Sequence, residues 1–229
     1  MIVTRVETHD FRNLQAVALD PHARFTVLCG DNAQGKTNLL EAVYLLGMRR
    51  SFRATRTSEM IRFGAEAATV RGRANVGALM RDVEVQLKAD GRRVLVDGKG
   101  VRASSPKLEG LAAVLFTPDD LAVPRGSPSG RRQLLDTAIA TVWPGYQQLG
   151  RDYQKTLATR NRLLREQPSG FAELLDVYDT QLAQLGAKIV AARRRYLAQL
   201  LPRFEDAFAR IAHSGVRGTL SYRTDEALV

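Results

Sequence analysis

The sequence is poor in cysteine and in long apolar runs, and each shortage excludes a class of protein. One cysteine, Cys29, among 229 residues rules out an intramolecular disulfide and a multi-cysteine metal site. No stretch approaches the roughly 18 consecutive apolar residues that a membrane-spanning helix requires. The opening MIVTRVETHDFRN mixes acids and bases where a secretory signal would carry an apolar run. We therefore expect a soluble, cytoplasmic protein without a membrane segment.

Lysine is also scarce, and arginine supplies most of the positive charge. Lys+Arg total 34 against 24 Asp+Glu, so the net charge is +10, and only six of these bases are lysine. Such an excess is typical of surfaces that bind nucleic-acid phosphates, but it also arises from an arginine-rich proteome bias spread over a solvated surface. Charge alone does not decide between these interpretations. Hydrophobic residues make up 45% of the chain, which excludes a wholly disordered protein.

The first 120 residues combine strand signals with one helix. Apolar residues near the N-terminus and the run Phe25–Cys29 predict strands, and Cys29 is expected in the core. A helix is predicted from about 35 to 47, and its apolar positions cover so much of its circumference that it should be buried. Alternating residues around the Asp-Gly pairs at 90–91 and 97–98 predict an antiparallel sheet within 67–103.

After Pro118 the sequence becomes helical. Ser127-Pro128, a cap followed by a first-turn proline, predicts a helix that ends before Pro144-Gly145, and a second helix is predicted over about 146–166. A third helical segment should kink at Pro202 and end near Ser214-Gly215, before a strand-like segment at 220–222. Its apolar residues alternate in steps of three and four, the spacing of a coiled-coil seam. These seam residues are Phe171, Leu175, Tyr178, Leu182, Leu185, Ile189, Ala192, Tyr196 and Leu200.

The segment Gly30–Thr37, GDNAQGKT, fits the phosphate-binding loop (P-loop) pattern of Gly, four residues and Gly-Lys-Thr. Backbone N–H groups of such a loop surround phosphate oxygens, and its glycines permit the close approach. Lys36 is expected to reach the outer phosphates, and the Thr37 hydroxyl to bind Mg²⁺. The helix that follows directs its N-terminal dipole at the same anion. The predicted nucleotide-binding residues are Gly30, Asp31, Asn32, Ala33, Gln34, Gly35, Lys36 and Thr37.

The wider segment Gly30–Glu41, preceded by Phe11-Arg12-Asn13-Leu14, resembles the ATPase head shared by SMC and RecF proteins. Within that group the chain looks like the RecF family of bacterial recombination mediators. The segments that carry this narrower resemblance are Arg50–Arg53, Phe116–Leu121 and Gly126–Asp136. Leu134 departs from the pattern, which usually has an aromatic residue there. The resemblance implies an α/β fold: a P-loop ABC-type ATPase head with an antiparallel β subdomain and an inserted helical, coiled-coil-like arm.

The resemblance also implies a division of the chain and further site residues. The ATPase head lobe with the P-loop would span 1–120, the helical arm 121–213, and the start of a return into the head 214–229. Arg12 and Asn13 would lie near the adenine, although a polar strand end is the alternative. Several other bases can contact DNA, form ion pairs with nearby acids or lie on a solvated face. They are Arg131, Arg132, Arg193, Arg194 and Arg195.

RecF-type proteins dimerise around ATP and bind single-stranded or gapped DNA. With RecO and RecR they help to load the RecA recombinase, so the resemblance implies ATP and Mg²⁺ as cofactors and a role in DNA repair, recombination and replication. The alternatives are an ABC-type transporter ATPase subunit, another P-loop NTPase such as a small-molecule kinase, and a nucleotide-binding scaffold without a DNA role. The long helical segment, the arginine excess and the RecF-like segments favour the first interpretation.

Three features that the family carries toward its C-terminus are absent from these 229 residues. They are a Leu-Ser-x-Gly signature, a second strand that ends in an acidic pair, and a switch histidine. Without the second carboxylate nothing completes the Mg²⁺ shell or positions water. Without the signature ATP gains no extra contact in a dimer. We therefore expect this chain neither to hydrolyse ATP alone nor to dimerise with it.

Overall fold

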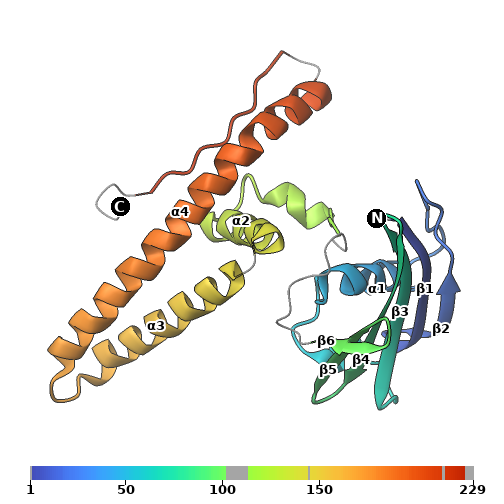
Figure 1. Ribbon diagram of the computed structural model, residues 1–229, viewed down its shortest axis with the longest axis horizontal. Helices are drawn as coiled ribbons and strands as arrows, with labels where there is room; N and C mark the ends of the chain where they lie inside the picture. Colours follow the sequence, from blue (N-terminus) through green and yellow to red (C-terminus); the bar gives the residue numbers. More distant parts are fainter. Residues whose placement is uncertain (1, 102–112, 144, 213–214, 225–229) are drawn as a thin grey trace. The chain divides into compact units, whose positions relative to one another are not determined.

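The structure is a computed structural model that describes residues 2–101, 113–143, 145–212 and 215–224. The chain divides into two compact units, Met1–Thr117 and Pro118–Val229, which are described separately below as the first and second unit. The described residues of the first unit form a β-sheet and one α-helix, and those of the second are mainly helical (Figure 1). This arrangement confirms the α/β class that the sequence predicts. No helix among the described residues is long and apolar enough to cross a membrane.

Six strands form one antiparallel sheet in the first unit, in the order β2-β1-β3-β4-β5-β6. Their bounds are β1 Ile2–Phe11, β2 Leu14–Leu19, β3 Ala67–Val76, β4 Leu79–Lys88, β5 Gly91–Val96 and β6 Lys99–Val101. The antiparallel sheet predicted from the Asp-Gly pairs is confirmed, because β4 pairs with β5 and β5 pairs with β6 across those turns. Asp97 and Gly98 both have positive φ, at 49° and 75°, as a tight turn demands.

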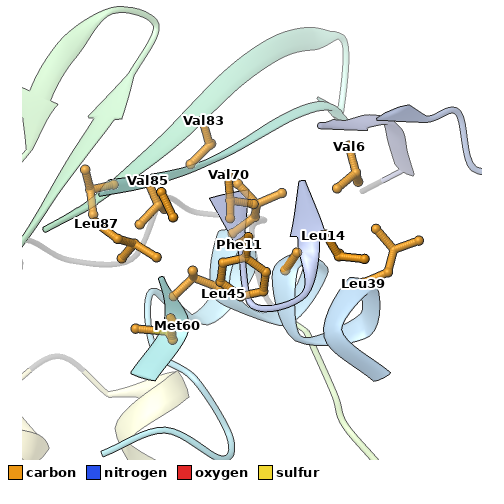
Figure 2. Close-up of a cluster of buried hydrophobic side chains, with 14 of the residues drawn as sticks. Val6, Phe11, Leu14, Leu39, Leu45, Met60, Val70, Val83, Val85 and Leu87 are labelled. Atoms are coloured by element: carbon orange, nitrogen blue, oxygen red, sulfur yellow. The ribbon is translucent and has the colours of Figure 1, made fainter. Parts of the chain in front are cut away.

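Helix α1, Lys36–Met48, packs on one face of this sheet (Figure 1). Its Leu39 and Leu45 belong to the same buried cluster as Phe11 and several strand residues (Figure 2). Gly72 of β3 permits the close approach, since a Cβ there would lie 2.4 Å from the Leu46 Cδ1 atom. The predicted burial of this helix is therefore confirmed for most of its apolar residues, whereas Leu40 is 50% exposed. A short 3-10 helix, η1 Thr57–Met60, adds Met60 to the same core.

The opposite face of the sheet carries charged side chains that pair across neighbouring strands. The Arg71 Nε atom lies 2.9 Å from Glu84 Oε2, and the Arg73 Nε atom lies 2.7 Å from Asp82 Oδ1. These residues stand opposite one another in the register of β3 and β4. Hydrogen bonding to Glu84 is the main cause that raises the pKa of Arg71 above its usual value. Acidic neighbours therefore balance these arginines of the sheet.

Two predicted strands are wrong. The run Phe25–Cys29 forms no strand, and the exposed fractions of Phe25 and Val27 are 77% and 62%. Cys29 is exposed too, which corrects its expected place in the core. The apolar composition suits a strand, but a strand needs a neighbour to pair its backbone, and no strand among the described residues pairs with this run. The segment at 220–222 likewise forms no strand.

The second unit begins with the 3-10 helix η2, Pro118–Ala122, followed by α2, Pro128–Val142, and α3, Tyr146–Glu166. Ser127 caps α2 as predicted, because its Oγ atom accepts a hydrogen bond from the Gly130 N–H at 3.3 Å. Proline occupies the first turn of that helix, where its missing N–H costs nothing. The observed bounds of α3 agree with the predicted 146–166.

Helix α4, Phe171–Ala212, packs side by side with α3 (Figure 1). All nine predicted seam residues are buried or partly buried, which confirms the spacing argument. The helix continues through Pro202, and the predicted end at Ser214 lies outside the described residues. The chain then returns along α4: Gly218 lies so near Phe208 that a Cβ on it would be 2.7 Å from the Phe208 Cγ atom.

Candidate nucleotide-binding site

The predicted P-loop has a backbone that few residue types could adopt. Gly30, Ala33 and Gly35 have φ of 140°, 65° and 96°, the left-handed region that glycine enters freely. Gly35 is further constrained, because a Cβ on it would lie 2.5 Å from Leu14 Cδ2 and 2.9 Å from Asn13 Oδ1. Glycine is therefore required at that position both for its φ and for the close packing.

Lys36 holds this loop together from within. Its Nζ atom donates hydrogen bonds to the backbone oxygens of Gly30, at 2.7 Å, and Asp31, at 2.5 Å. The loop thus curls around a positive charge, and residues 30–34 are exposed. An anion that approaches the loop meets this ammonium group among backbone groups.

The N-terminus of α1 adds a second source of positive potential. Gly35 occupies the cap position, no side chain caps the helix, and its first turn contains no acidic residue. The first backbone N–H groups and the positive end of the helix dipole are therefore directed at the loop without a competing carboxylate. Thr37, the second residue of α1, is exposed. These residues suit a polyphosphate with its Mg²⁺.

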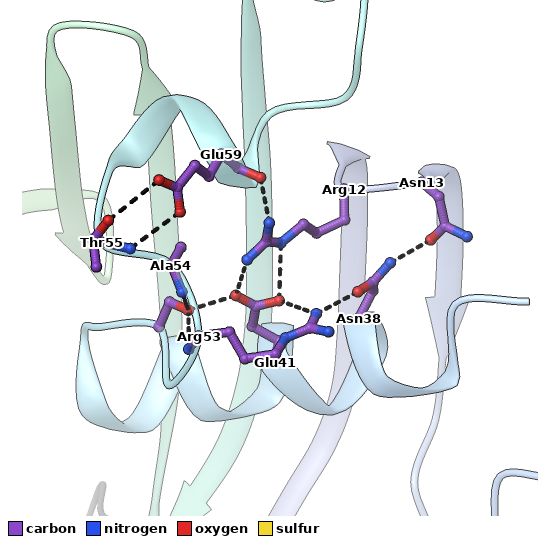
Figure 3. Close-up of polar contacts among 9 residues, drawn as sticks. Arg12, Asn13, Asn38, Glu41, Arg53, Ala54, Thr55 and Glu59 are labelled. Atoms are coloured by element: carbon purple, nitrogen blue, oxygen red, sulfur yellow. Dashed lines mark hydrogen bonds and ion pairs between the residues drawn. The ribbon is translucent and has the colours of Figure 1, made fainter. Parts of the chain in front are cut away.

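Asn13 contacts the loop directly, whereas Arg12 does not. These residues form the two-residue turn between β1 and β2, with Arg12 at φ 56°. The Asn13 Nδ2 atom donates to the Ala33 backbone oxygen at 2.9 Å. The Arg12 guanidinium instead donates to both carboxylate oxygens of Glu41, at 3.0 and 2.8 Å, and to the Glu59 backbone oxygen (Figure 3). Arg12 is therefore occupied with α1 and η1.

Glu41 lies at the centre of a buried ionic cluster. Its carboxylate is fully buried and accepts hydrogen bonds from Arg12, from Ser51 Oγ at 2.5 Å and from Arg53 NH2 at 2.5 Å. Burial alone would raise the pKa of Glu41, but the hydrogen bonds from Arg12, Ser51 and Arg53 outweigh it and hold that pKa below its usual range. Glu41 is not among the site residues predicted from the sequence. The available signal was an acid inside a helix expected to be buried, where a charge needs a partner.

Asn38 connects the cluster to the loop. Its Nδ2 atom donates to Asn13 Oδ1 at 2.6 Å, and its Oδ1 atom accepts from Arg53 NH2 at 2.5 Å. Hydrogen bonds therefore run without a break from Glu41 through Arg53 and Asn38 to Asn13 (Figure 3). Asn13 in turn contacts the Ala33 carbonyl. We refer to these residues, with Arg12 and Ser51, as the Glu41 network. The network therefore helps to hold the loop in place through Asn13.

Comparison with known proteins identifies the family. A family model described as the RecF/RecN/SMC N terminal domain matches residues 2–109. The DNA replication and repair protein RecF of Myxococcus xanthus is 40% identical over 223 residues, which cover 97% of this chain and 59% of that protein. RecF of Syntrophotalea carbinolica is 38% identical over 225 residues, covering 98% and 61%. The chain belongs to the RecF family. It spans about 60% of the length of these curated relatives.

Solved RecF structures share the fold. The recombination mediator protein RecF of the RecFOR pathway, in the structure designated RecF-ATPrS, superposes with a TM-score of 0.78 at 31% identity, covering 92% of this chain and 58% of that one. The structure of RecF with ATP gives a TM-score of 0.77 at 29% identity, covering 96% and 63%. This RecF-family chain therefore has the fold of an ATPase head with its helical arm.

The arginines predicted to contact DNA differ in their exposure and in the hydrogen bonds that their guanidinium groups already form. Arg193 of α4 donates to both carboxylate oxygens of Asp136, at 2.8 and 2.7 Å, and to the Tyr222 hydroxyl at 2.9 Å. Its side chain is only 13% exposed. The Arg131 NH1 atom donates to the Gly126 backbone oxygen at 2.7 Å, and the Arg195 guanidinium lies 5.0 Å from the Trp143 ring centroid. Arg132 and Arg194 are exposed on α2 and α4.

Proposed function

We propose that this RecF-family chain binds ATP through Gly30–Thr37, with Mg²⁺ as its cofactor. The observation that carries the proposal is the Lys36 ammonium held between the Gly30 and Asp31 carbonyls, at the uncapped N-terminus of α1. Lys36 would bind the outer phosphates, the loop N–H groups the oxygens between them, and Thr37 the cation. Asn13, which already contacts the loop, and Arg12 would lie on the nucleoside side of the site. The ATP in a RecF structure of the same fold supports this assignment.

Competition for a fluorescent ATP analogue tests which part of the nucleotide the site binds. Because every feature of the loop is suited to an anion, ATP and inorganic tripolyphosphate should both displace the analogue. Adenosine should compete at least about a hundredfold less well, since two charged hydrogen bonds of about 1.5 kcal/mol each are worth about that factor. Omission of Mg²⁺ should weaken the binding of ATP. Adenosine that competes as well as ATP would show that the loop does not bind phosphates.

We further propose that the chain acts on DNA in repair, recombination and replication. By family resemblance the DNA is single-stranded or gapped and is bound in an ATP-dependent way, RecO- and RecR-type mediators are partners, and RecA loading is the outcome. A full-length chain would form the ATP-dependent homodimer. The net charge of +10 supports an anionic partner. Among the bases weighed above, the exposed Arg132 and Arg194 suit DNA better than Arg193, whose donors are occupied.

A further inference from the structure

Helix α3 carries a row of bases that differs from the paired arginines of the sheet. Arg71 and Arg73 each have a carboxylate within 3 Å, as described above. The four bases on the outer side of α3 are instead exposed, and none of them forms an ion pair within the described part of the chain. We refer to them as the α3 stripe. They are Arg151, Lys155, Arg162 and Arg165.

Helix geometry aligns these four residues in one row. At about 100° per residue they fall within an arc of roughly 80°, and at about 1.5 Å per residue the row extends over roughly 21 Å. The buried and half-buried residues Tyr153, Thr156 and Leu163 lie on the other side of α3, which packs against α4. The stripe is therefore directed away from the packed side of the helix.

Both acids of α3 lie beside the stripe, because Asp152 is three residues before Lys155 and Glu166 is four residues after Arg162. Among the acids of α3, Asp152 accepts a hydrogen bond from Gln148 Nε2 at 2.7 Å, and Glu166 is the last residue of the helix. The remaining base of the helix, Arg160, is on the packed side and forms an ion pair with Asp179 of α4. The helix thus pairs Arg160 with an acid, whereas the stripe bases form no ion pair in the described part of the chain; one of them, Arg151, donates to Gln148 Oε1 at 3.1 and 2.7 Å.

We propose that the α3 stripe binds the phosphate backbone of double-stranded DNA. The inference rests on the DNA-binding role proposed above and names the surface that performs it. A row of bases on a straight α-helix matches the straight axis of a DNA duplex. About 21 Å of duplex presents roughly 12 phosphate charges at one per 1.7 Å. Surfaces that bind single strands add aromatic side chains on which bases stack. The tyrosines of α3, Tyr146 and Tyr153, are both packed inward with Ile189. Contacts to phosphates alone carry no sequence preference.

A substitution at Ala158 tests the stripe through a gain in affinity, which loss of folding could not produce. Ala158 is exposed, and helix geometry places it inside the arc of the stripe, between Lys155 and Arg162. Each phosphate contact changes the salt slope by about 0.9, which corresponds to about eightfold in affinity at 0.1 M salt. Ala158→Lys should therefore tighten duplex binding by about eightfold, and Ala158→Glu should weaken it at least as much. Lysine and glutamate both favour helices, so neither change should disturb α3.

A second pair of variants separates the stripe from net charge. R151Q/K155Q/R162Q/R165Q removes the stripe, and R24Q/R56Q/K88Q/K99Q removes four exposed bases of the first unit, so both lose the same charge. Fluorescence anisotropy with a labelled duplex, over a series of salt concentrations, measures both variants of the 229-residue chain. The slope of log K against log salt concentration should become shallower by up to about 3.6 in the stripe variant and by much less in the control.

The outcomes distinguish the two levels of the proposal. If the parent chain binds no duplex at 50 mM salt, the DNA-binding role proposed for this chain fails with the inference. If the parent binds and the Ala158 variants bind as the parent does, the stripe inference alone is wrong. Equal losses in both fourfold variants would assign the affinity to net charge. A larger loss on a single-stranded oligonucleotide than on a duplex would overturn the choice of duplex. Circular dichroism verifies that each variant is folded.

Discussion

Lys36→Ala should weaken ATP binding by roughly 10- to 150-fold and leave the fold intact. A hydrogen bond to a charged group contributes about 1.5–3 kcal/mol, and the ammonium is the one side-chain charge held inside the loop. The Gly30 and Asp31 carbonyls that Lys36 contacts are on exposed residues, so water can replace it. Titration with a fluorescent ATP analogue measures the affinity, and urea denaturation measures the free energy of unfolding.

The control for this variant is Lys88→Ala, which removes the same charge from an exposed site at the end of β4. Its ATP affinity should stay within about twofold of the parent, because Lys88 belongs neither to the loop nor to the Glu41 network and salt screens an exposed charge. If Lys36→Ala binds ATP as tightly as the parent, the P-loop assignment is wrong. If both variants lose affinity equally, net charge attracts the nucleotide.

Glu41→Ala should lower the free energy of unfolding of the first unit by about 3–5 kcal/mol. Removal of one member of a buried ion pair leaves the other charge without compensation, and here two arginines, Arg12 and Arg53, lose the same carboxylate. The Arg53 side chain is 39% exposed and recovers some hydration, which favours the lower end of the range. Urea denaturation measures the loss. Glu66→Ala, an exposed acid in the same unit, should change stability by less than about 0.5 kcal/mol.

The same carboxylate should make the first unit sensitive to acid. The pKa of Glu41 is depressed in the folded protein, so the unfolded chain takes up the proton first as the pH falls. The stabilisation is fully present above the unfolded pKa of about 4.3 and is lost as the pH falls through the folded pKa. Glu41→Gln should remove this part of the acid sensitivity. An unchanged dependence of stability on pH in that variant would show that Glu41 does not titrate in the way its surroundings require.

Local signals explain why much of the fold could be predicted. The Asp-Gly turns, the Ser127 cap and the three-four spacing of α4 each depend on residues close together in the chain, and the structure contains all of them. The loop and α1 were likewise predictable from Gly30–Thr37 and the apolar residues that follow. These features express backbone preferences and side-chain periodicity, which a single sequence displays directly.

The remaining features depend on residues far apart in the chain. Phe25–Cys29 reads as a strand, but no described strand lies beside it to accept its hydrogen bonds. Arg193 reads as part of a basic run, yet its partner Asp136 is 57 residues away. The Glu41 network joins the turn between β1 and β2, helix α1 and the segment after α1, and only the folded chain brings Arg12 and Arg53 to one carboxylate. Composition cannot show such pairings.

The order of strands in the sheet also bears on how the chain acquires its structure. β1 lies between β2 and β3, so the sheet is complete only when Ile2 has paired with Asn75, which is distant in the chain. By contrast, residues 167–170 alone separate α3 from α4. Contacts between distant residues require a costly loop closure and slow folding, and contacts between neighbours form quickly. During synthesis the N-terminal strands emerge first, yet β1 has no third strand to pair with until β3 has been made. We therefore expect the helical hairpin of α3 and α4 to form rapidly once it has emerged, while the sheet depends on the slower search.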